Sequence, residues 1–154
     1  AIAIVGKEKG IYRLLHIDLK KNISFQQQRL LIDDVFQRYH VKRMNIDKTG
    51  IGMQLSEEIV TAHPNLAFGK HFTRKLKERL ALNLLKLCED KKLQIYNDSI
   101  LLSQLHAIKK KATATGITYD AERDETGHAD GFWAIALAVN ELSWGEEPIH
   151  IEVW

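Results

Sequence analysis

The sequence predicts one domain of the α/β class, a mixed sheet with helices on both faces. After an initial hairpin, strand-like segments alternate with helical segments, and this order is typical of a sheet that helices cover. The 154 residues, 45% of them apolar, are enough for one core and too few for two. The single cysteine, Cys88, excludes a disulfide framework and a cysteine-based zinc site.

The first half of the chain predicts a hairpin and then a strand between two helices. Residues 1–19 hold two strand-like segments on either side of a glycine-bounded polar loop. Ser24 and Gln27 form a capping-box pattern, which begins a helix that reaches about Tyr39. Residues 41–47 predict a short strand, and the turn "KTGIG" leads into a second helix that ends near Thr61, before Pro64.

The second half predicts a short strand at residues 65–68 and a long helix over residues 70–89. The second half of that helix is apolar nearly all round, so we expect it to be well buried. A strand at 93–96 follows, then a helix to about Ala107 that Asp98 or Ser99 caps, and then a hairpin that turns at Thr115 and Gly116. The last helix opens with "GHAD", and its alanines allow close approach to the sheet.

Bulk properties exclude few functions. The formal net charge of +2 is too small to indicate nucleic-acid binding by itself. No apolar run reaches the length of a membrane span, and the first residues lack the pattern of a signal peptide. We therefore expect a protein of the cytoplasm with no membrane partner.

Two carboxylates are the main candidates for chemistry. Asp47 ends a predicted strand, and ligand sites of α/β sheets lie at such ends. Asp130 stands in the opening turn of the last helix. Each has a structural alternative, because Asp often closes a turn or caps a helix. Together they are the parts of an oxygen-rich Mg²⁺ or Mn²⁺ site, which in-line displacement at phosphate requires.

The two segments that hold these acids resemble a known family. The pattern "D-x-T-G-x-G-x-x-L" at residues 47–55 and "G-H-A-D-x-x-W-A-x-A-L-A" at residues 127–138 are similar to the C-terminal nuclease domain of phage and prophage terminase large subunits, closest to the Mu-like prophage type. The resemblance extends over essentially the whole chain. It implies a ribonuclease H-like fold and metal-dependent cutting of double-stranded DNA during genome packaging, with Asp47 and Asp130 among the acids.

The resemblance also implies what this sequence does not contain. In that family a further acid lies on a strand directly before the segment that matches residues 1–10, so we expect that first strand to be missing here. No Walker motif is present, so the ATPase half of the family is absent from this sequence. We expect one domain over residues 1–145, truncated at its N-terminus, and a tail over residues 146–154 that could pair with an exposed sheet edge.

Other polar residues near these motifs have two interpretations each. Asp124 is a candidate third metal ligand, as is Glu122, although either could be a solvated loop acid. His128 is a candidate catalytic residue that could orient a water molecule or contact a phosphate, and it could equally be exposed or cap the helix.

Basic residues in "GKHFTRKLKER" and at positions 109–111 could contact the DNA backbone, since phosphate neutralisation gives affinity that does not depend on sequence. A solvated helix face is the alternative. The candidates for DNA contact are Lys70, Arg74, Lys77 and Lys110.

The leading hypothesis is a nuclease domain with two Mg²⁺ or Mn²⁺ ions, one activating the attacking water and the other stabilising the leaving 3′-oxygen. The implied partners are double-stranded DNA, the terminase small subunit and the portal. Two alternatives stay open: a ribonuclease H-like nuclease of another kind, such as a junction resolvase, and a non-catalytic module that holds DNA or assembles a packaging motor.

Overall fold

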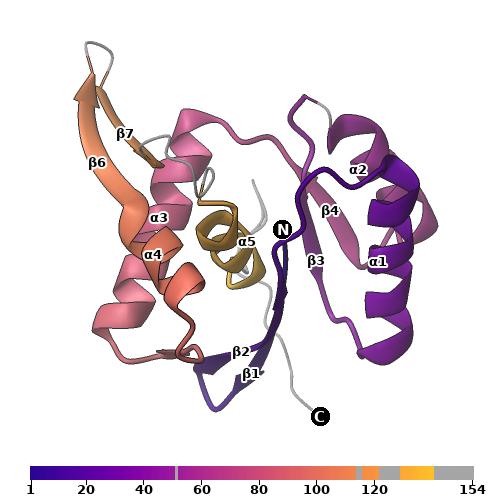
Figure 1. Ribbon diagram of the computed structural model, residues 1–154, viewed down its shortest axis with the longest axis horizontal. Helices are drawn as coiled ribbons and strands as arrows, with labels where there is room; N and C mark the ends of the chain where they lie inside the picture. Colours follow the sequence, from indigo (N-terminus) through magenta and orange to yellow (C-terminus); the bar gives the residue numbers. More distant parts are fainter. Residues whose placement is uncertain (51, 114–115, 122–128, 141–154) are drawn as a thin grey trace.

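The computed structural model describes residues 1–50, 52–113, 116–121 and 129–140 (Figure 1). It confirms the predicted α/β class and, with small shifts at their ends, the predicted elements. Their order is β1 (Ile2–Glu8), β2 (Ile11–Asp18), α1 (Phe25–Arg38), β3 (Met44–Asp47), α2 (Gly52–Ala62), β4 (Ala67–Lys70), α3 (Arg74–Glu89), β5 (Leu93–Gln94), α4 (Ser99–Ala107), β6 (Ile108–Thr113), β7 (Gly116–Ala121) and α5 (Asp130–Ala138).

The described strands divide among three small sheets. In the first, β2 pairs antiparallel with β1 and parallel with β5, so this sheet is mixed as expected. In the second, β3 and β4 pair in parallel, and β6 and β7 form an antiparallel hairpin. Among the described residues β1 and β3 each have a strand partner on one side only. The sheet that the sequence predicts as one layer is therefore divided between β1 and β3.

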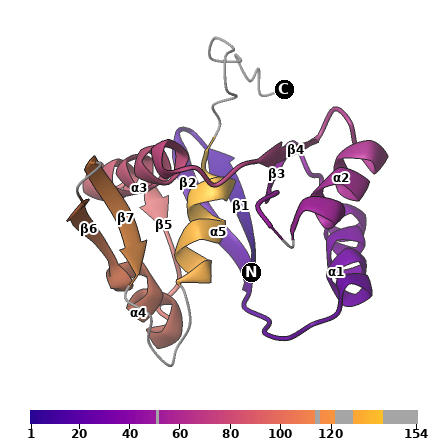
Figure 2. The same ribbon diagram turned by 90° about the horizontal axis from the view of Figure 1, so that it is seen from above.

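Helix α5 occupies the centre of the molecule. Both ribbon views place it between α3, α4 and the β6–β7 hairpin on one side and β3, β4, α1 and α2 on the other (Figures 1 and 2). It packs against β1, β3, α3 and α4. Its residues Ile135 and Ala136 are fully buried and belong to the larger apolar cluster, together with Leu76, Leu80 and Leu101.

Strand β3 separates a core face from a polar face. Met44 and Ile46 pack against the smaller apolar cluster, which holds Ile59 of α2 and Ile32 of α1. Because side chains alternate along a strand, Asn45 and Asp47 point to the opposite face. Asn45 contacts the end of α5 there, so Asp47 lies on the face of β3 that α5 covers.

The long helix ends at Glu89 as predicted, but its start and the burial of its second half differ from the prediction. It begins at Arg74, where the Thr73 hydroxyl accepts a hydrogen bond from the Leu76 N–H, and the predicted start at residue 70 is wrong because Lys70 lies in β4. The expectation that its second half is buried all round is also wrong, since Leu82 and Leu85 are 46% and 53% exposed. Only one stripe of this helix faces the core, and Leu76, Leu80 and Leu84 form it.

Two predicted N-caps are confirmed. Ser24 and Gln27 form the full capping box of α1. Asp98 caps α4, and its Oδ1 accepts a hydrogen bond of 2.8 Å from the Leu101 N–H. Replacing Asp98 by Ala is expected to lower the free energy of unfolding by about 1 kcal/mol, because this N–H loses its acceptor. Urea unfolding measures the loss, and Asp98→Ser, which keeps a capping oxygen, is the matched control.

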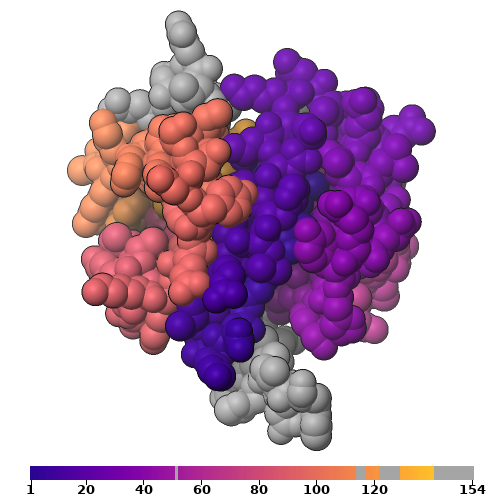
Figure 3. Space-filling view, turned by 60° about the horizontal axis from the view of Figure 1, so that its bottom comes forward, coloured from indigo at the N-terminus to yellow at the C-terminus, as the bar shows by residue number. Residues whose placement is uncertain are grey.

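Figure 3 shows the N-terminal residues at the surface, between the residues of α4 and those of α1. None of the helices in the described part of the chain is long and apolar enough to cross a membrane. Residues 141–154 lie outside the described part, so the domain boundary at residue 145 and the pairing of the tail stay predictions.

Candidate functional site

A groove of about 1310 Å³ runs between the two halves of the divided sheet. Its walls come from β1, β3 and α5 and from the loop that follows β3. Both predicted acids line it, Asp47 from the end of β3 and Asp130 from the start of α5. The structure thus brings to one groove two carboxylates that lie far apart in the sequence, and both side chains belong to exposed residues.

The turn after β3 holds Asp47 in a defined position. Asp47 Oδ1 accepts a hydrogen bond of 2.8 Å from the Thr49 N–H, so the turn interpretation of this residue is confirmed. The Thr49 hydroxyl in turn accepts a hydrogen bond from the Phe72 N–H at 2.9 Å. One bond uses only part of the capacity of a carboxylate, which can accept about four. The turn role of Asp47 therefore leaves it able to bind an ion.

Glycine is required at two positions in this turn, for a different physical reason at each. Gly50 has φ +60, which is a left-handed conformation. For a residue with a Cβ atom this conformation is unfavourable. A Cβ atom on Gly52 would lie 2.6 Å from the backbone oxygen of Asp47, closer than such atoms come. The first turn of α2 therefore packs directly against the backbone of Asp47.

The start of α5 is built differently. Its N-cap is Ala129, which has φ 55 and ψ 40, is almost fully buried and makes no side-chain capping bond. Asp130 is the first residue inside the helix, so the interpretation of Asp130 as the N-cap is wrong. The buried side chain of Gln104, on α4, accepts a hydrogen bond of 2.7 Å from the Gly131 N–H instead. Residues held in the left-handed region often occur at functional sites.

A lysine paired with another carboxylate also lines this groove. The ammonium of Lys77, on α3, lies 3.7 Å from Asp120 Oδ1 on β7 and 5.3 Å from the centre of the Trp133 ring on α5. The ring of Phe72 meets Trp133 edge to face and continues this wall. Asp120 is not predicted as a site residue, because nothing in the local sequence distinguishes it from a solvated strand acid.

Three of the described candidates for DNA contact do not line the groove. Arg74 and Lys110 are exposed on α3 and β6 and do not line it. Lys70 is buried at the end of β4, so its ammonium does not lie on an exposed helix face as expected. His128 and Asp124, with Glu122, lie outside the described residues.

The donor chemistry of the groove fits a hard divalent ion. Asp47 and Asp130 offer carboxylate oxygens, which Mg²⁺ and Mn²⁺ prefer. Within residues 1–50, 52–113, 116–121 and 129–140, no group of three or more His, Cys, Asp or Glu side chains could hold an ion. These two acids therefore supply part of a ligand set. Cys88 is a poor alternative nucleophile, since partial burial, with the charge of Glu89, raises the pKa of its thiol.

Comparison with known proteins identifies similar sequences. The sequence model of a family described as the terminase RNaseH-like domain matches residues 1–142. The probable terminase ATPase subunit of Haemophilus phage HP1 (strain HP1c1) is 26% identical over 147 residues, which are 93% of this chain and 24% of that protein. The terminase ATPase subunit of Escherichia phage P2 is 29% identical over 135 residues, 84% of this chain and 22% of that protein. The chain thus spans less than a quarter of the length of either relative.

Solved structures share the fold. The large terminase nuclease of thermophilic phage G20c, with bound magnesium, superposes with a TM-score of 0.67 at 22% identity, covering 89% of this chain and 79% of that one. The large terminase nuclease domain of Thermus phage P74-26 gives a TM-score of 0.64 at 21% identity, covering 88% of this chain and 75% of that one. At such identities the likeness establishes a common fold.

Proposed function

The chain belongs to the family of terminase RNaseH-like domains, and from that premise we propose that it is a metal-dependent endonuclease domain that cuts double-stranded DNA during phage genome packaging. One observation carries the proposal beyond the fold. Asp47 and Asp130, the acids of the two motifs that resemble the family, open onto the same groove. The expected Mu-like type stays a prediction.

Asp47 and Asp130 would hold the divalent ion. The large terminase nuclease of phage G20c has been solved with magnesium and with cobalt, which supports a divalent ion in this fold. When bound, such an ion supplies charge neutralisation at the phosphate and lowers the pKa of a water molecule. We also propose that two such ions bind and that they are Mg²⁺ or Mn²⁺.

The surrounding residues would position the substrate. The Thr49 N–H fixes one oxygen of Asp47, so that carboxylate is oriented before an ion arrives. The ammonium of Lys77 is held by Asp120 and the Trp133 ring at the groove wall, where it can bind a phosphate oxygen. The apolar rings of Phe72 and Trp133 restrict water on that side of the groove. The proposed roles of His128 as a catalytic residue and Asp124 as a ligand await a test.

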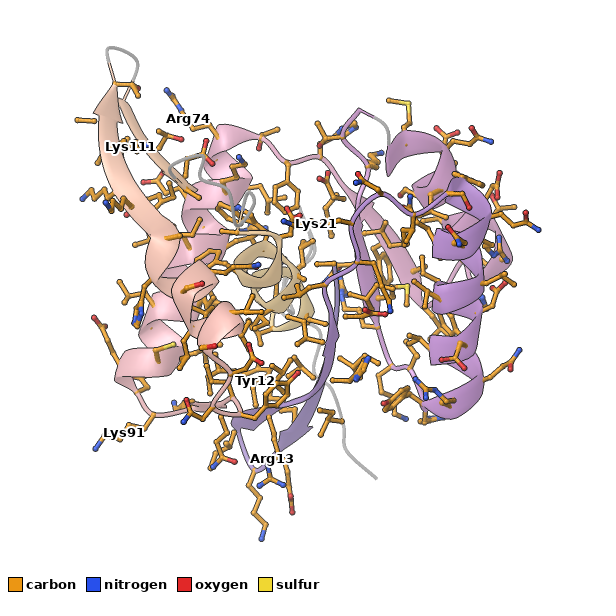
Figure 4. All side chains as sticks on the ribbon, viewed as in Figure 1. Tyr12, Arg13, Lys21, Arg74, Lys91 and Lys111 are labelled. Carbon is orange, nitrogen blue, oxygen red and sulfur yellow. The ribbon has the colours of Figure 1, made fainter. Side chains whose placement is uncertain are left out.

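We propose that the DNA backbone approaches along the start of α3 and the β6 strand. Figure 4 shows Arg74 and Lys111 at the end of the molecule where α3 begins, and Lys91 at the opposite end of that helix. Lys110 is exposed next to Lys111, and Lys77 lies one helical turn from Arg74. Because Lys70 is buried, we leave it out of this surface.

Removing Arg74 and Lys110 together is expected to reduce the salt dependence of DNA binding. Each lost phosphate contact lowers the slope of log affinity against log salt by about 1, so Arg74→Gln with Lys110→Gln should lower it by about 2. Fluorescence anisotropy with a duplex at several salt concentrations measures the slope. Lys91→Gln removes a charge at the other end of α3 and should leave it unchanged. An unaltered slope in the double variant would place the DNA elsewhere.

The decisive test is cleavage of duplex DNA by a protein that also carries the upstream strand expected from the resemblance, with Mg²⁺ or Mn²⁺ and with the ions removed by a chelator. The proposal expects cleavage of linear duplex only with the ion. A junction-resolving nuclease should instead prefer branched over linear DNA. A non-catalytic module should bind DNA in a salt-sensitive manner with no cleavage and no response to Mn²⁺.

The proposal also covers the assembly, the partners and the cellular location of the whole protein. The relatives from phages HP1 and P2 are terminase ATPase subunits, which supports a place in a packaging motor. The proposed partners are double-stranded DNA, the terminase small subunit and the portal, in the cytoplasm of the bacterial host.

A further inference from the structure

Helix α5 carries Asp130 on an otherwise apolar helix. The sequence "DGFWAIALA" offers its neighbours almost only apolar side chains, and most of them are buried. The free energy of apolar burial depends on the buried area and is not directional. It therefore does little to set the axial position and the rotation of a helix relative to the elements it packs against. The position of Asp130 relative to Asp47 therefore depends on the directional contacts that α5 makes.

The first directional contact is at the N-terminus of α5. Gln104 Oε1 accepts the Gly131 N–H at 2.7 Å, and Gln104 is itself 7% exposed. The contact is tight, because a Cβ atom on Gly131 would lie 2.7 Å from the same oxygen. Gln104 thus replaces the missing N-cap side chain from another helix and holds the residue that follows Asp130.

The second directional contact is at the C-terminus of α5. The Asn45 amide nitrogen donates to the backbone oxygens of Leu137 and Asn140, at 2.9 and 3.0 Å. The Arg43 Nε donates to the Asn45 amide oxygen at 3.3 Å, and its guanidinium lies 4.2 Å from the centre of the Phe68 ring. The orientation of the Asn45 amide is therefore fixed by a donor on one side and acceptors on the other.

Asn45 stands two positions before Asp47 on β3, so both side chains lie on the same face of the strand. We infer that Asn45 and Gln104 are positioning residues that hold α5 at its two ends and thereby keep Asp130 in register with Asp47. The inference rests on the proposed function in that the two acids act together. It assigns a positioning role to two amides, of which Asn45 lines the groove and Gln104 is buried beneath the start of α5.

Mn²⁺ titration by calorimetry on the protein tests the inference directly. Asn45→Leu removes the donor, and Gln104→Met removes the acceptor at similar side-chain volume. Partners that orient the ligands of a metal commonly change affinity by about 10- to 100-fold, and we expect a rise of that size in the Kd for Mn²⁺ in each variant. Gln104→Glu keeps an acceptor oxygen and should bind at least as tightly as the unchanged protein.

A control separates positioning from general loss of stability. Ile59→Val trims a fully buried side chain in the other apolar cluster, so it destabilises the protein without touching α5. It should leave the Kd unchanged. If Asn45→Leu and Gln104→Met fold and bind Mn²⁺ as the unchanged protein does, or if Ile59→Val weakens binding as much as they do, the inference is wrong. Should Gln104→Met fail to fold, Asn45→Leu decides the question.

Amide hydrogen exchange in the metal-free protein tests the positioning role separately from the proposed function. In the metal-free protein the Gly131 amide should exchange at least about tenfold faster in Gln104→Met than in the unchanged protein or in Gln104→Glu, since its acceptor is lost. If Asp130→Asn binds Mn²⁺ like the unchanged protein, the proposed function fails, whereas this exchange result still decides whether Gln104 holds the start of α5. Equal exchange in all three proteins would overturn the role of Gln104.

Discussion

Replacing Asp130 by Asn is expected to abolish metal-dependent cleavage of DNA while leaving the fold intact. The substitution keeps the shape of the side chain and removes the charge that would bind the ion. Loss of several kcal/mol of charge stabilisation corresponds to a rate lower by at least about 10³-fold. Because Asp130 is exposed in the first turn of α5, removing its charge should cost only about 0.3–1 kcal/mol of stability through the helix dipole.

Asp47→Asn is expected to have the same effect on cleavage. An Asn side chain still offers an oxygen to the Thr49 N–H, so the turn after β3 should survive and the loss should be confined to the ion. Initial rates on linear duplex with Mn²⁺, beside thermal unfolding without metal, measure both quantities. Asp34→Asn is the matched control and should leave cleavage unchanged, since it removes a half-exposed carboxylate of α1, paired with Arg38, that does not line the groove. Full activity in Asp47→Asn and Asp130→Asn would contradict the site.

The elements could be predicted because their signals are local. Ser24 with Gln27, Asp98, and Pro64 after α2 each act on a backbone group within a few residues, so the sequence alone identifies where these helices start or stop. Lys70 shows the limit of such signals. The sequence predicts a short strand at residues 65–68, but the observed strand extends to Lys70 because Asp47 of β3 pairs with that residue, and the extent of such long-range pairing is not visible in the local sequence.

The residues of the site likewise fall into those with a local sequence signal and those without one. Asp47 could be identified because it ends a strand, and Asp130 because it belongs to a motif that resembles the family. The alternation of side chains along β3 could also have identified Asn45 as a neighbour of Asp47. Gln104 carries no such signal, because a single polar residue in an apolar helix is compatible with many roles. Its contact with Gly131 becomes visible only once α4 and α5 are packed together.

Gly52→Ala is expected to damage both stability and ion binding, although residue 52 contacts neither ion nor DNA. The added Cβ atom would lie 2.6 Å from the Asp47 backbone oxygen, and a backbone atom cannot rotate aside as a side chain can. Overpacking of this kind typically costs about 1–3 kcal/mol. The strain is relieved only if the backbone of Asp47 or the first turn of α2 moves. A shift of about 1 Å at a reacting group can cost about 10²-fold in rate, so Mn²⁺ affinity and cleavage should both fall.

Gly50→Ala is the matched control, because it strains the same turn without pressing on Asp47. No atom lies within 4 Å of the added Cβ there, but φ is +60, so we expect a cost of about 1–2 kcal/mol from the left-handed conformation alone. Urea unfolding and Mn²⁺ titration of the two variants separate the effects. If loop strain alone governed the site, both variants would lose ion affinity equally. A loss confined to Gly52→Ala follows only if the packing of α2 against the backbone of Asp47 sets the position of that carboxylate.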